Sequence, residues 1–348
     1  MLDYSVSTLD EVSVHRVGNK NNDEELLISK QRLDISDKSV EELLQKFFLN
    51  QFKSDEYFNF TFSNDDFNMN PLFKYCSDVF EGIGDFHLNT INIAKYLYDS
   101  SNHPMIKTGD VFVAHFSRLM LDYKEVNAIG IFKSESKHAF LKLQPGSSEF
   151  QISREEGIQI DKPDKACLIF NDDRDNGYKL CILDKTNKSE EALFWKEKFL
   201  QVTPCKDEYH HTKDFLDIAK NFVTKVLPEN FEVNKSDQID LLNRSMDYFK
   251  SRDTFDKAEF EEEVFQDQAL IESFKQYDKT YRDENQIELE DSFDINLSAV
   301  KKQARVFKSI LKLDRNFHIY IHGDKELIVP GVEKDGRKYY KIYYENEN

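Results

Sequence analysis

The sequence has few residues that interrupt regular structure, and it has no long hydrophobic run. Only 11 of the 348 residues are Gly and 7 are Pro, which opposes a repetitive all-β fold or long linkers. No segment approaches the roughly 20 consecutive apolar residues that span a bilayer. The amino terminus lacks the basic start and apolar stretch of a signal peptide. These absences predict a cytoplasmic protein with no membrane partner.

Cysteine is also scarce, because the chain contains only four. They are Cys76, Cys167, Cys181 and Cys205, and no two have C-x-x-C spacing. This density is far below that of a disulfide-stabilised scaffold. Cys167 and Cys181 lie in apolar runs, where we expect reduced thiols packed in a core.

The common catalytic motifs are absent. The sequence contains no P-loop, no G-x-G-x-x-G, no G-x-S-x-G and no H-E-x-x-H. His318 and His322 lie in the extended segment FHIYIHG, where four residues of strand would separate them by about 13 Å, too far to share a metal ion. The pair His210 and His211 is more typical of a loop or helix cap than of metal ligands. We therefore predict no cofactor.

One set of residues could still form an enzyme site. Asp110 begins a predicted strand, and Glu135 and Lys137 form an E-x-K after the next strand. A D…E-x-K set can bind a divalent cation and activate water for phosphodiester attack. This E-x-K falls in a predicted turn, whereas such sites need rigid geometry. A metal-dependent nuclease is therefore only the third hypothesis, and we predict that the protein is not an enzyme.

What the sequence does contain is a high proportion of aromatic residues, with 29 Phe and 16 Tyr. Disordered chains are poor in aromatics, so this content indicates a packed core. In the first half, apolar alternation predicts strands at 11–17, 109–117, 125–135, 138–144, 166–172 and 178–185. Helical spacing predicts helices at 39–54 (with Ser39 as N-cap), 71–81 and 87–100. Consecutive strands with short loops indicate an antiparallel sheet.

The second half is predicted to be largely helical. Helices are expected at 189–200, 212–227 (opening at Thr212 and closing before Pro228), 236–251, 256–265, 267–281 and 298–313. Strands at 317–323 and 337–344 then end the chain as a β-hairpin. The predicted fold is α+β, with a mixed domain at 1–205 and a mainly helical domain at 206–348. The last strands could instead complete the sheet of the first domain.

Charge is unevenly distributed along the chain. The formal net charge is −18, yet residues 298–315 carry six basic residues and one acidic residue. On a helix, most of these cations would fall within about 80° of one another, opposite an apolar face. This stripe gives the candidate DNA-binding residues Lys301, Lys302, Arg305, Lys308, Lys312 and Arg315. A solvated face and a surface for an acidic protein partner are the alternative interpretations.

An acidic block precedes this stripe. Residues 254–294 carry fourteen acidic and four basic residues. A solvated helical face is one interpretation of this block. The other is that it shields the basic stripe until a partner displaces it.

Several segments resemble one bacterial family. They are KTGDVFVAHFSRLMLDYKEVNAIGIFKSE (107–135), IELEDSFDINLSAVKKQARVF (287–307), FHIYIHGDKELI (317–328) and VSVHRVGNKNNDEELLIS (12–29). Together they resemble the 37-kilodalton nucleoid-associated bacterial protein family (NdpA/YejK-like), and NAIGIFKSE and FLKL are similar to its Bacteroidetes-type branch. The resemblance implies a cytoplasmic, nucleoid-located protein with links to DNA and to chromosome-topology enzymes. It supplies no catalytic residues.

The sequence therefore predicts an acidic, nucleoid-associated interaction protein of bacterial chromosome organisation. Its partner would be DNA, in weak and sequence-nonspecific DNA-binding, or a DNA-bound protein. The alternative is an adaptor that modulates a topoisomerase or another chromosome factor without touching DNA. A homodimer is also compatible with the sequence.

Overall fold

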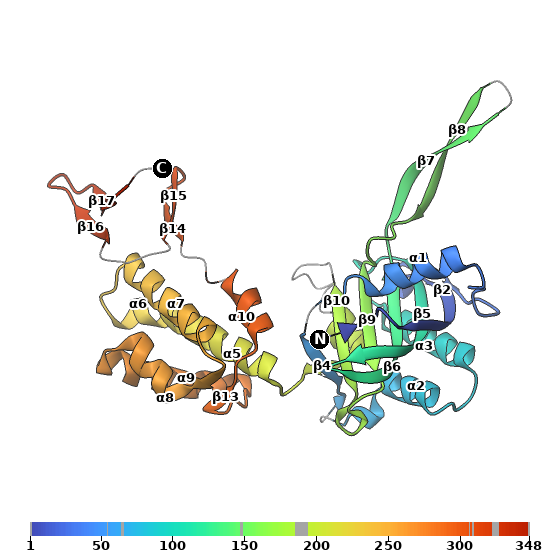
Figure 1. Ribbon diagram of the computed structural model, residues 1–348, viewed down its shortest axis with the longest axis horizontal. Coiled ribbons are helices and arrows are strands. Elements are labelled where there is room, and N and C mark those ends of the chain that lie inside the picture. The colour runs from blue at the N-terminus through green and yellow to red at the C-terminus, as the bar shows by residue number, and fades with distance from the viewer. Residues whose placement is uncertain are drawn as a thin grey trace. The chain divides into compact units, whose positions relative to one another are not determined.

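The structure is a computed structural model that describes residues 2–53, 55–63, 66–146, 149–184, 194–305, 307, 310–321 and 327–346. The chain divides into two compact units, Met1–Cys205 and Lys206–Asn348 (Figure 1). Helices and antiparallel strands occur in both units, and the chain ends in a β-hairpin. The predicted α+β fold is therefore confirmed.

A nine-stranded sheet forms the centre of the first unit. Its strands are β1 (Leu2–Asp3), β2 (Thr8–Val17), β3 (Leu26–Leu27), β4 (Tyr57–Phe60), β5 (Gly109–Leu121), β6 (Lys124–Ser134), β9 (Lys165–Phe170), β10 (Lys179–Asp184) and β11 (Val202–Pro204). They follow the order β11-β4-β10-β9-β6-β5-β2-β3, with β1 paired to β5. Every pairing is antiparallel, as the short loops predict.

Helices cover both faces of this sheet, which explains why its central strands are apolar at nearly every position. Alternate residues of a strand point to opposite faces. On one face, Val113 and Ile131 share a buried cluster with α2 (Pro71–Phe80) and α3 (Phe86–Ser100). On the other face, Phe116 and Phe132 share a cluster with α1 (Lys38–Leu49). There, Phe48 stacks on Phe132 with ring centroids 4.2 Å apart.

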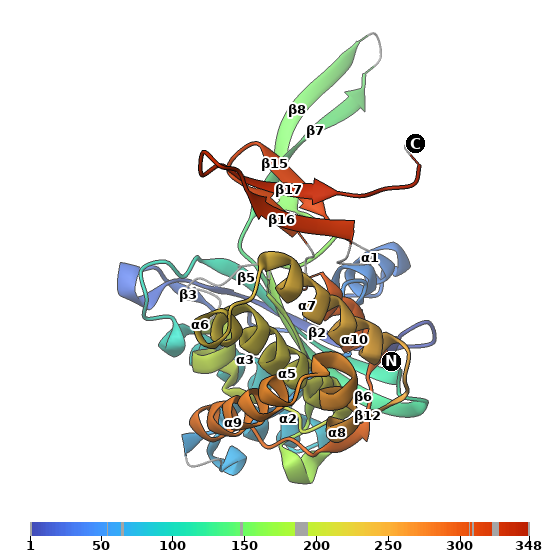
Figure 2. The ribbon, with the colours of Figure 1, turned by 90° about the vertical axis from the view of Figure 1, so that its left-hand side faces the viewer.

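A separate hairpin leaves the sheet of the first unit. It consists of β7 (Lys137–Pro145) and β8 (Phe150–Ile158), which pair only with each other among the described strands (Figures 1 and 2). The register places Leu141, Leu143 and Ile152 on one face, because directly opposed residues share a face. These side chains are 63% to 68% exposed. The hairpin thus presents an apolar surface to solvent.

The second unit is built around a core of phenylalanine. Its helices are α5 (Glu208–Asn221), α6 (Leu227–Asn230), α7 (Lys235–Lys250), α8 (Lys257–Phe260), α9 (Gln268–Asn285) and α10 (Leu297–Ala304), with π-helical turns at Phe222–Val226 and Glu261–Phe265. A strand pair, β12 (Thr254–Asp256) with β13 (Ser292–Asp294), closes the core. Phe215 lies fully buried among Phe249, Phe255 and Phe260. Burial of such large rings dominates the stability of a core.

Two short hairpins follow the helices. They are β14 (Ile310–Leu313) with β15 (Phe317–Tyr320), and β16 (Ile328–Val332) with β17 (Lys338–Ile342). Leu311, Ile321 and Ile328 form a small buried cluster with Ile239 of α7. Figure 2 shows the hairpins beside α7. Within the described residues these strands pair only with each other, so they do not complete the first unit's sheet.

The predicted helix at 298–313 is wrong in its second half. α10 ends at Ala304, and residues 310–313 form β14. Leu311 and Leu313 alternate with Ile310 and Lys312, so a strand also buries the leucines on one side. Asp314 adopts a left-handed conformation (φ 51°) that starts the turn to β15, as Asp tolerates in turns. Turn formation and pairing with β15 therefore outweigh the helical spacing.

Several boundaries also differ from prediction. α1 is capped by Asp37 and not by Ser39, and α5 begins at Glu208 after Asp207, ahead of Thr212. The helix does not close before Pro228, because α5, the π-helical turn Phe222–Val226 and α6 follow one another without a break to Asn230. Helix 189–200 is partly outside the described residues, and Phe194–Leu200 is π-helical. The strands that were not predicted are β1, β4, β8, β11, β12, β13, β14 and β16.

Candidate nucleic-acid interface

α10 has one buried and one charged side. Asn296 caps the helix, because its side chain accepts hydrogen bonds from the backbone N–H groups of Ser298 and Ala299. Val300 is 2% exposed and belongs to the phenylalanine core. Lys301 and Lys302 are exposed. The short helix thus holds two cations at the surface while its apolar side is fixed by packing.

The remaining candidates lie on other elements. Arg305 is the exposed C-cap residue directly after α10. Lys312 is exposed on β14, and Arg315 is exposed in the turn that follows. Lys308 lies outside the described residues. The single helical stripe predicted from the sequence is therefore wrong, since its members occupy a helix, a helix end, a strand and a turn.

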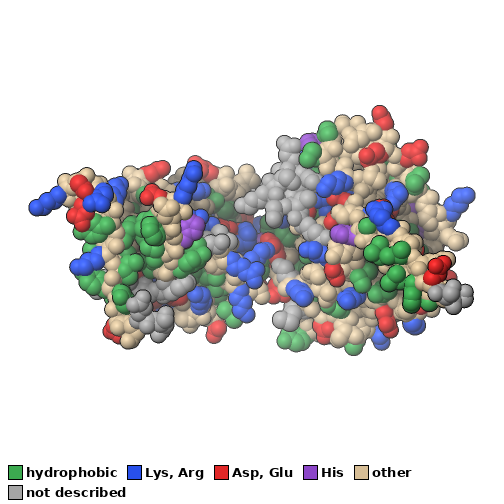
Figure 3. Space-filling model, turned by 90° about the horizontal axis from the view of Figure 1, so that it is seen from above, with side chains coloured by type: hydrophobic (Ala, Val, Ile, Leu, Met, Phe, Trp, Pro, Cys, Tyr) green, Lys and Arg blue, Asp and Glu red, His purple; other side chains and the backbone are tan. Residues whose placement is uncertain are grey.

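Two of these cations lie next to aromatic or imidazole rings. Lys302 Nζ is 5.7 Å from the centroid of the Tyr209 ring, within cation–π range. Lys312 is directly opposite His318 in the β14–β15 ladder. Figure 3 shows Lys and Arg side chains interspersed with apolar ones on this side of the second unit. Lys302 and Lys312 thus each have a ring as a neighbour.

Ion pairs leave most of this cationic surface available. In the part of the chain that the structure describes, no carboxylate pairs with Lys301, Arg305, Lys312 or Arg315. A phosphate could therefore approach them without displacing a protein carboxylate. Among the described residues, no carboxylate of the acidic block pairs with Lys301 or Arg305, as a shield over these two cations would require.

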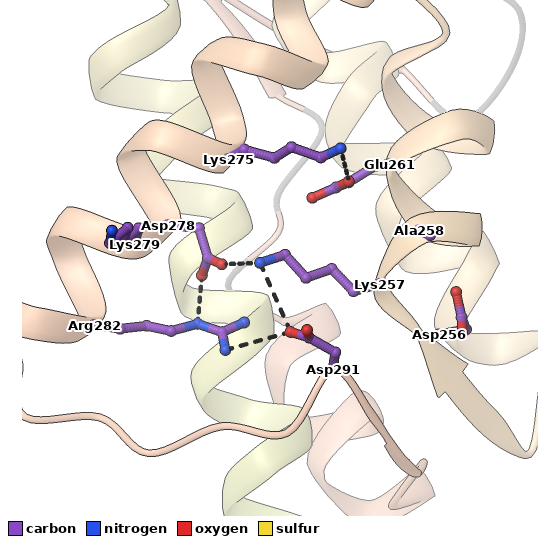
Figure 4. Close-up of a pocket in the computed structure, with 9 residues that line it drawn as sticks. All are labelled: Asp256, Lys257, Ala258, Glu261, Lys275, Asp278, Lys279, Arg282 and Asp291. Carbon is purple, nitrogen blue, oxygen red and sulfur yellow. Dashed lines mark hydrogen bonds and ion pairs between the residues drawn. The ribbon is translucent and has the colours of Figure 1, made fainter.

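The acidic block forms ion pairs largely with its own basic residues. Asp278, whose side chain is 1% exposed, contacts Lys257 Nζ at 2.5 Å and Arg282 Nε at 2.7 Å. Lys275 lies 3.3 Å from Glu261, and burial raises the pKa of that carboxyl group. Figure 4 shows these side chains converging in a polar pocket between α8 and α9. The ion pairs in this pocket connect α9 to α8 and to the π-helical turn that follows α8, so they support the fold of the second unit.

A local charge excess accompanies the candidate surface. Residues 297–348 contain eleven Lys and Arg against seven Asp and Glu, a net charge of +4. The remaining residues, 1–296, contain 36 basic and 58 acidic side chains, a net charge of −22. Long-range repulsion from DNA therefore comes from the rest of the chain, while the carboxy-terminal segment is locally attractive to phosphate.

Sequence analysis missed a second group of surface residues, on and beside β17. Arg337, Tyr339, Lys341 and Tyr343 recur at every second position, and all four are exposed. Period-two spacing on β17 places Tyr339 and Lys341 on one face, and Arg337 and Tyr343 flank the strand. The segment RKYYKIYY was recognised only as a strand, although its alternation of cations and aromatic rings was legible in the sequence.

The nuclease-like residues are already occupied by cations. Asp110 on β5 accepts contacts from Lys137 and from Arg16, the latter at 2.9 Å. Glu135 is bound by the buried Lys133 at 2.8 Å. Each carboxylate is thus neutralised by a protein cation, which opposes binding of a divalent metal ion. No cluster of three or more metal-ligating side chains occurs among the described residues.

Of the histidines singled out in the sequence, those that the structure describes lie on β15 and in the first turn of α5. His318 lies on β15, whereas His322 is outside the described residues. His210 lies in the first turn of α5, where its ring contacts the capping residue Asp207 at 2.9 Å. In the described helices, no stretch combines the length and hydropathy needed to cross a membrane.

Comparison with known proteins identifies the family. A search of curated proteins found no match to the chain. A family model described as nucleoid-associated protein YejK matches residues 13–343. The match covers the segments 107–135, 287–307 and 317–328 that carry the resemblance, and all but the first residue of the segment 12–29. The chain therefore belongs to the family of nucleoid-associated protein YejK.

Proposed function

We propose that this protein associates with the bacterial nucleoid in the cytoplasm through weak, sequence-nonspecific contact with DNA. The family described by its nucleoid-associated member supports the nucleoid-associated role. The observation that carries the DNA contact is the set of exposed cations Lys301, Arg305, Lys312 and Arg315, which have no carboxylate partner within the described residues. When such cations neutralise phosphates, the counterions condensed on the DNA are released, and this release drives nonspecific binding.

Weak binding follows from the charge of the whole chain. The net charge of −18 repels the phosphate backbone at long range. At short range the few available cations can each contact one phosphate, and the described surface has no long basic groove. We therefore expect affinity that is measurable at low salt and lost near physiological salt.

A gel-shift experiment with charge-reversal variants tests this proposal. The test variant is Lys301→Glu/Arg305→Glu/Lys312→Glu, and the control is Lys30→Glu/Lys74→Glu/Lys95→Glu, which changes three exposed cations of the first unit. Both variants alter the net charge equally. We expect duplex DNA to be shifted at low salt by the wild type and the control, and not by the test variant. If both variants lost DNA binding equally, the loss would be explained by the change in net charge alone, and the proposed interface would be refuted.

An adaptor that binds a topoisomerase or another chromosome protein is the second candidate. The exposed apolar face of β7–β8, with Leu141, Leu143 and Ile152, favours it, because such faces commonly mark protein contacts. Pulldown from lysate with and without nuclease separates the two functions. Partners that survive digestion and are lost with Leu141→Asp support the adaptor, whereas partners that vanish on digestion support DNA contact.

A further inference from the structure

The hairpin β16–β17 carries a row of alternating cations and rings. Tyr339 and Lys341 of β17 lie directly opposite Gly331 and Val329 of β16. Arg337 immediately precedes β17 and Tyr343 immediately follows it. All four members of the row, Arg337, Tyr339, Lys341 and Tyr343, are exposed, and they are called the β17 row below.

The other face of the hairpin is turned toward protein. Ile328 is 8% exposed and packs in the small cluster with Leu311 and Ile321, and Tyr340 packs against that cluster. Tyr340 is adjacent to Tyr339 in the strand, so their side chains point to opposite faces. The packing of one face therefore leaves the β17 row facing solvent.

Local contacts hold the two rings in place. A Cβ atom added at Gly331 would lie 2.2 Å from the ring of Tyr339, so the ring lies against the bare backbone of the glycine. Lys341 Nζ is 4.9 Å from the centroid of the Tyr343 ring, and a hydrogen bond to Tyr343 raises the pKa of Lys341. Tyr339 and Tyr343 are still 44% and 47% exposed. The rings are thus positioned by the hairpin and yet remain open to a ligand.

The charges beside the rings favour an anionic ligand. Residues 327–346 contain four basic and three acidic residues. Arg337 pairs with Asp335 at 2.8 Å, with side chains 82% and 54% exposed. Exposed pairs of this kind contribute little stability, so a phosphate can replace the carboxylate. Arg337 and Lys341 alternate with Tyr339 and Tyr343 along the chain. In a nucleic-acid strand, phosphates likewise alternate with bases along the backbone.

We propose that the β17 row is a binding platform for single-stranded nucleic acid, with bases stacked on Tyr339 and Tyr343 and phosphates held by Arg337 and Lys341. Aromatic rings flanked by cations bind single strands without sequence preference, because every base has a π face. In a duplex these faces are stacked on neighbouring bases, so the rings select single strands. The platform rests on the proposed nucleic-acid contact and adds its substrate class.

Fluorescence anisotropy tests the platform with two probes at low salt, a labelled 20-nucleotide oligothymidylate and a 20-base-pair duplex. We expect the wild type to bind the single strand more tightly. Tyr339→Ala/Tyr343→Ala should weaken that binding at least about fivefold, from the loss of stacking. Tyr339→Phe/Tyr343→Phe should retain it, since the rings remain. The control Tyr123→Ala, which removes a fully exposed tyrosine of the first unit, should leave it unchanged.

Photocrosslinking gives a second readout that does not depend on folding of the variants. An iodouracil-substituted single strand should crosslink the wild type at Tyr339 or Tyr343, as located by mass spectrometry. Crosslinks confined to other residues would overturn the platform. So would duplex binding at least as tight as single-strand binding, which would leave the proposed DNA contact standing. Absence of binding to both probes would overturn both proposals.

Discussion

Removing the carboxylate of Asp278 should destabilise the second unit selectively. Its side chain is 1% exposed and contacts both Lys257 and Arg282. In Asp278→Ala, these cations, whose side chains are only 20% and 13% exposed, would lose their main counter-charge. Asp291 lies 3.8 Å and 3.9 Å from them and offers partial compensation.

The magnitude follows from this burial. Breaking a buried ion pair by removing one partner costs about 3–5 kcal/mol, and the compensation by Asp291 places the effect near the lower limit, about 3 kcal/mol. At a slope of about 2 kcal/mol per molar urea, the unfolding midpoint of the second unit should fall by about 1.5 M. The matched control Asp247→Ala removes an exposed pair with Lys250 and should cost under about 1 kcal/mol.

Urea unfolding with two probes distinguishes the two units. Trp195 is the only tryptophan and lies buried in the first unit, so its fluorescence reports on that unit alone. Far-UV circular dichroism also reports on the helices of the second unit. We expect Asp278→Ala to shift the dichroism transition and to leave the fluorescence transition in place. A shift no larger than that of Asp247→Ala would refute the reasoning.

Three further predictions concern stability. Burial raises the pKa of Glu261, so the contribution of this carboxyl group to the stability of the second unit is lost as pH rises and the group ionises. Glu261→Gln should therefore raise the urea midpoint of the second unit at pH 7. The difference in midpoint from the wild type should become smaller below pH 4.5, where the carboxyl group is protonated. Burial and the nearby His87 lower the pKa of His15 from 6.5 to about 4. Stability of the first unit should therefore fall as pH drops below 6.5, less so in His15→Gln, as followed by Trp195 fluorescence. Asn296→Ala removes the cap of α10 and should cost about 1 kcal/mol by urea unfolding; an unchanged midpoint would contradict the cap.

Local sequence patterns were sufficient to predict secondary structure where the apolar residues of a segment follow one spacing, that of a strand or that of a helix. The run ACLIF in β9 is apolar at every position, because helices cover both faces of the sheet. The segment DRDNG that joins β9 to β10 ends in Gly177, which adopts a left-handed conformation at φ 93°, as glycine does readily in turns. In such segments the local preference and the tertiary environment agree, so the antiparallel sheet and most helices could be predicted.

Prediction failed where two periods compete. Residues 298–313 satisfy helical spacing, yet Leu311 and Leu313 also alternate, and the pairing with β15 depends on residues further along the chain. β8 contains Arg154, Glu155 and Glu156, so its apolar alternation is interrupted, and its partner β7 decides its structure. The arrangement of the candidate interface depends on the pairing of β14 with β15, which local sequence patterns do not determine. Its cations could therefore be predicted from the sequence, but their arrangement could not.

The salt dependence of duplex binding tests the proposed DNA contact most directly. Each phosphate contact lowers the slope of log K against log salt by about 0.9, so the exposed cations of α10, β14 and the adjoining turn predict a slope between roughly −2 and −4. The Lys301→Glu/Arg305→Glu/Lys312→Glu variant keeps only Arg315 of the four available cations, so its slope should be about −1 or shallower. A wild-type slope near zero, or no binding at low salt, would contradict direct DNA contact.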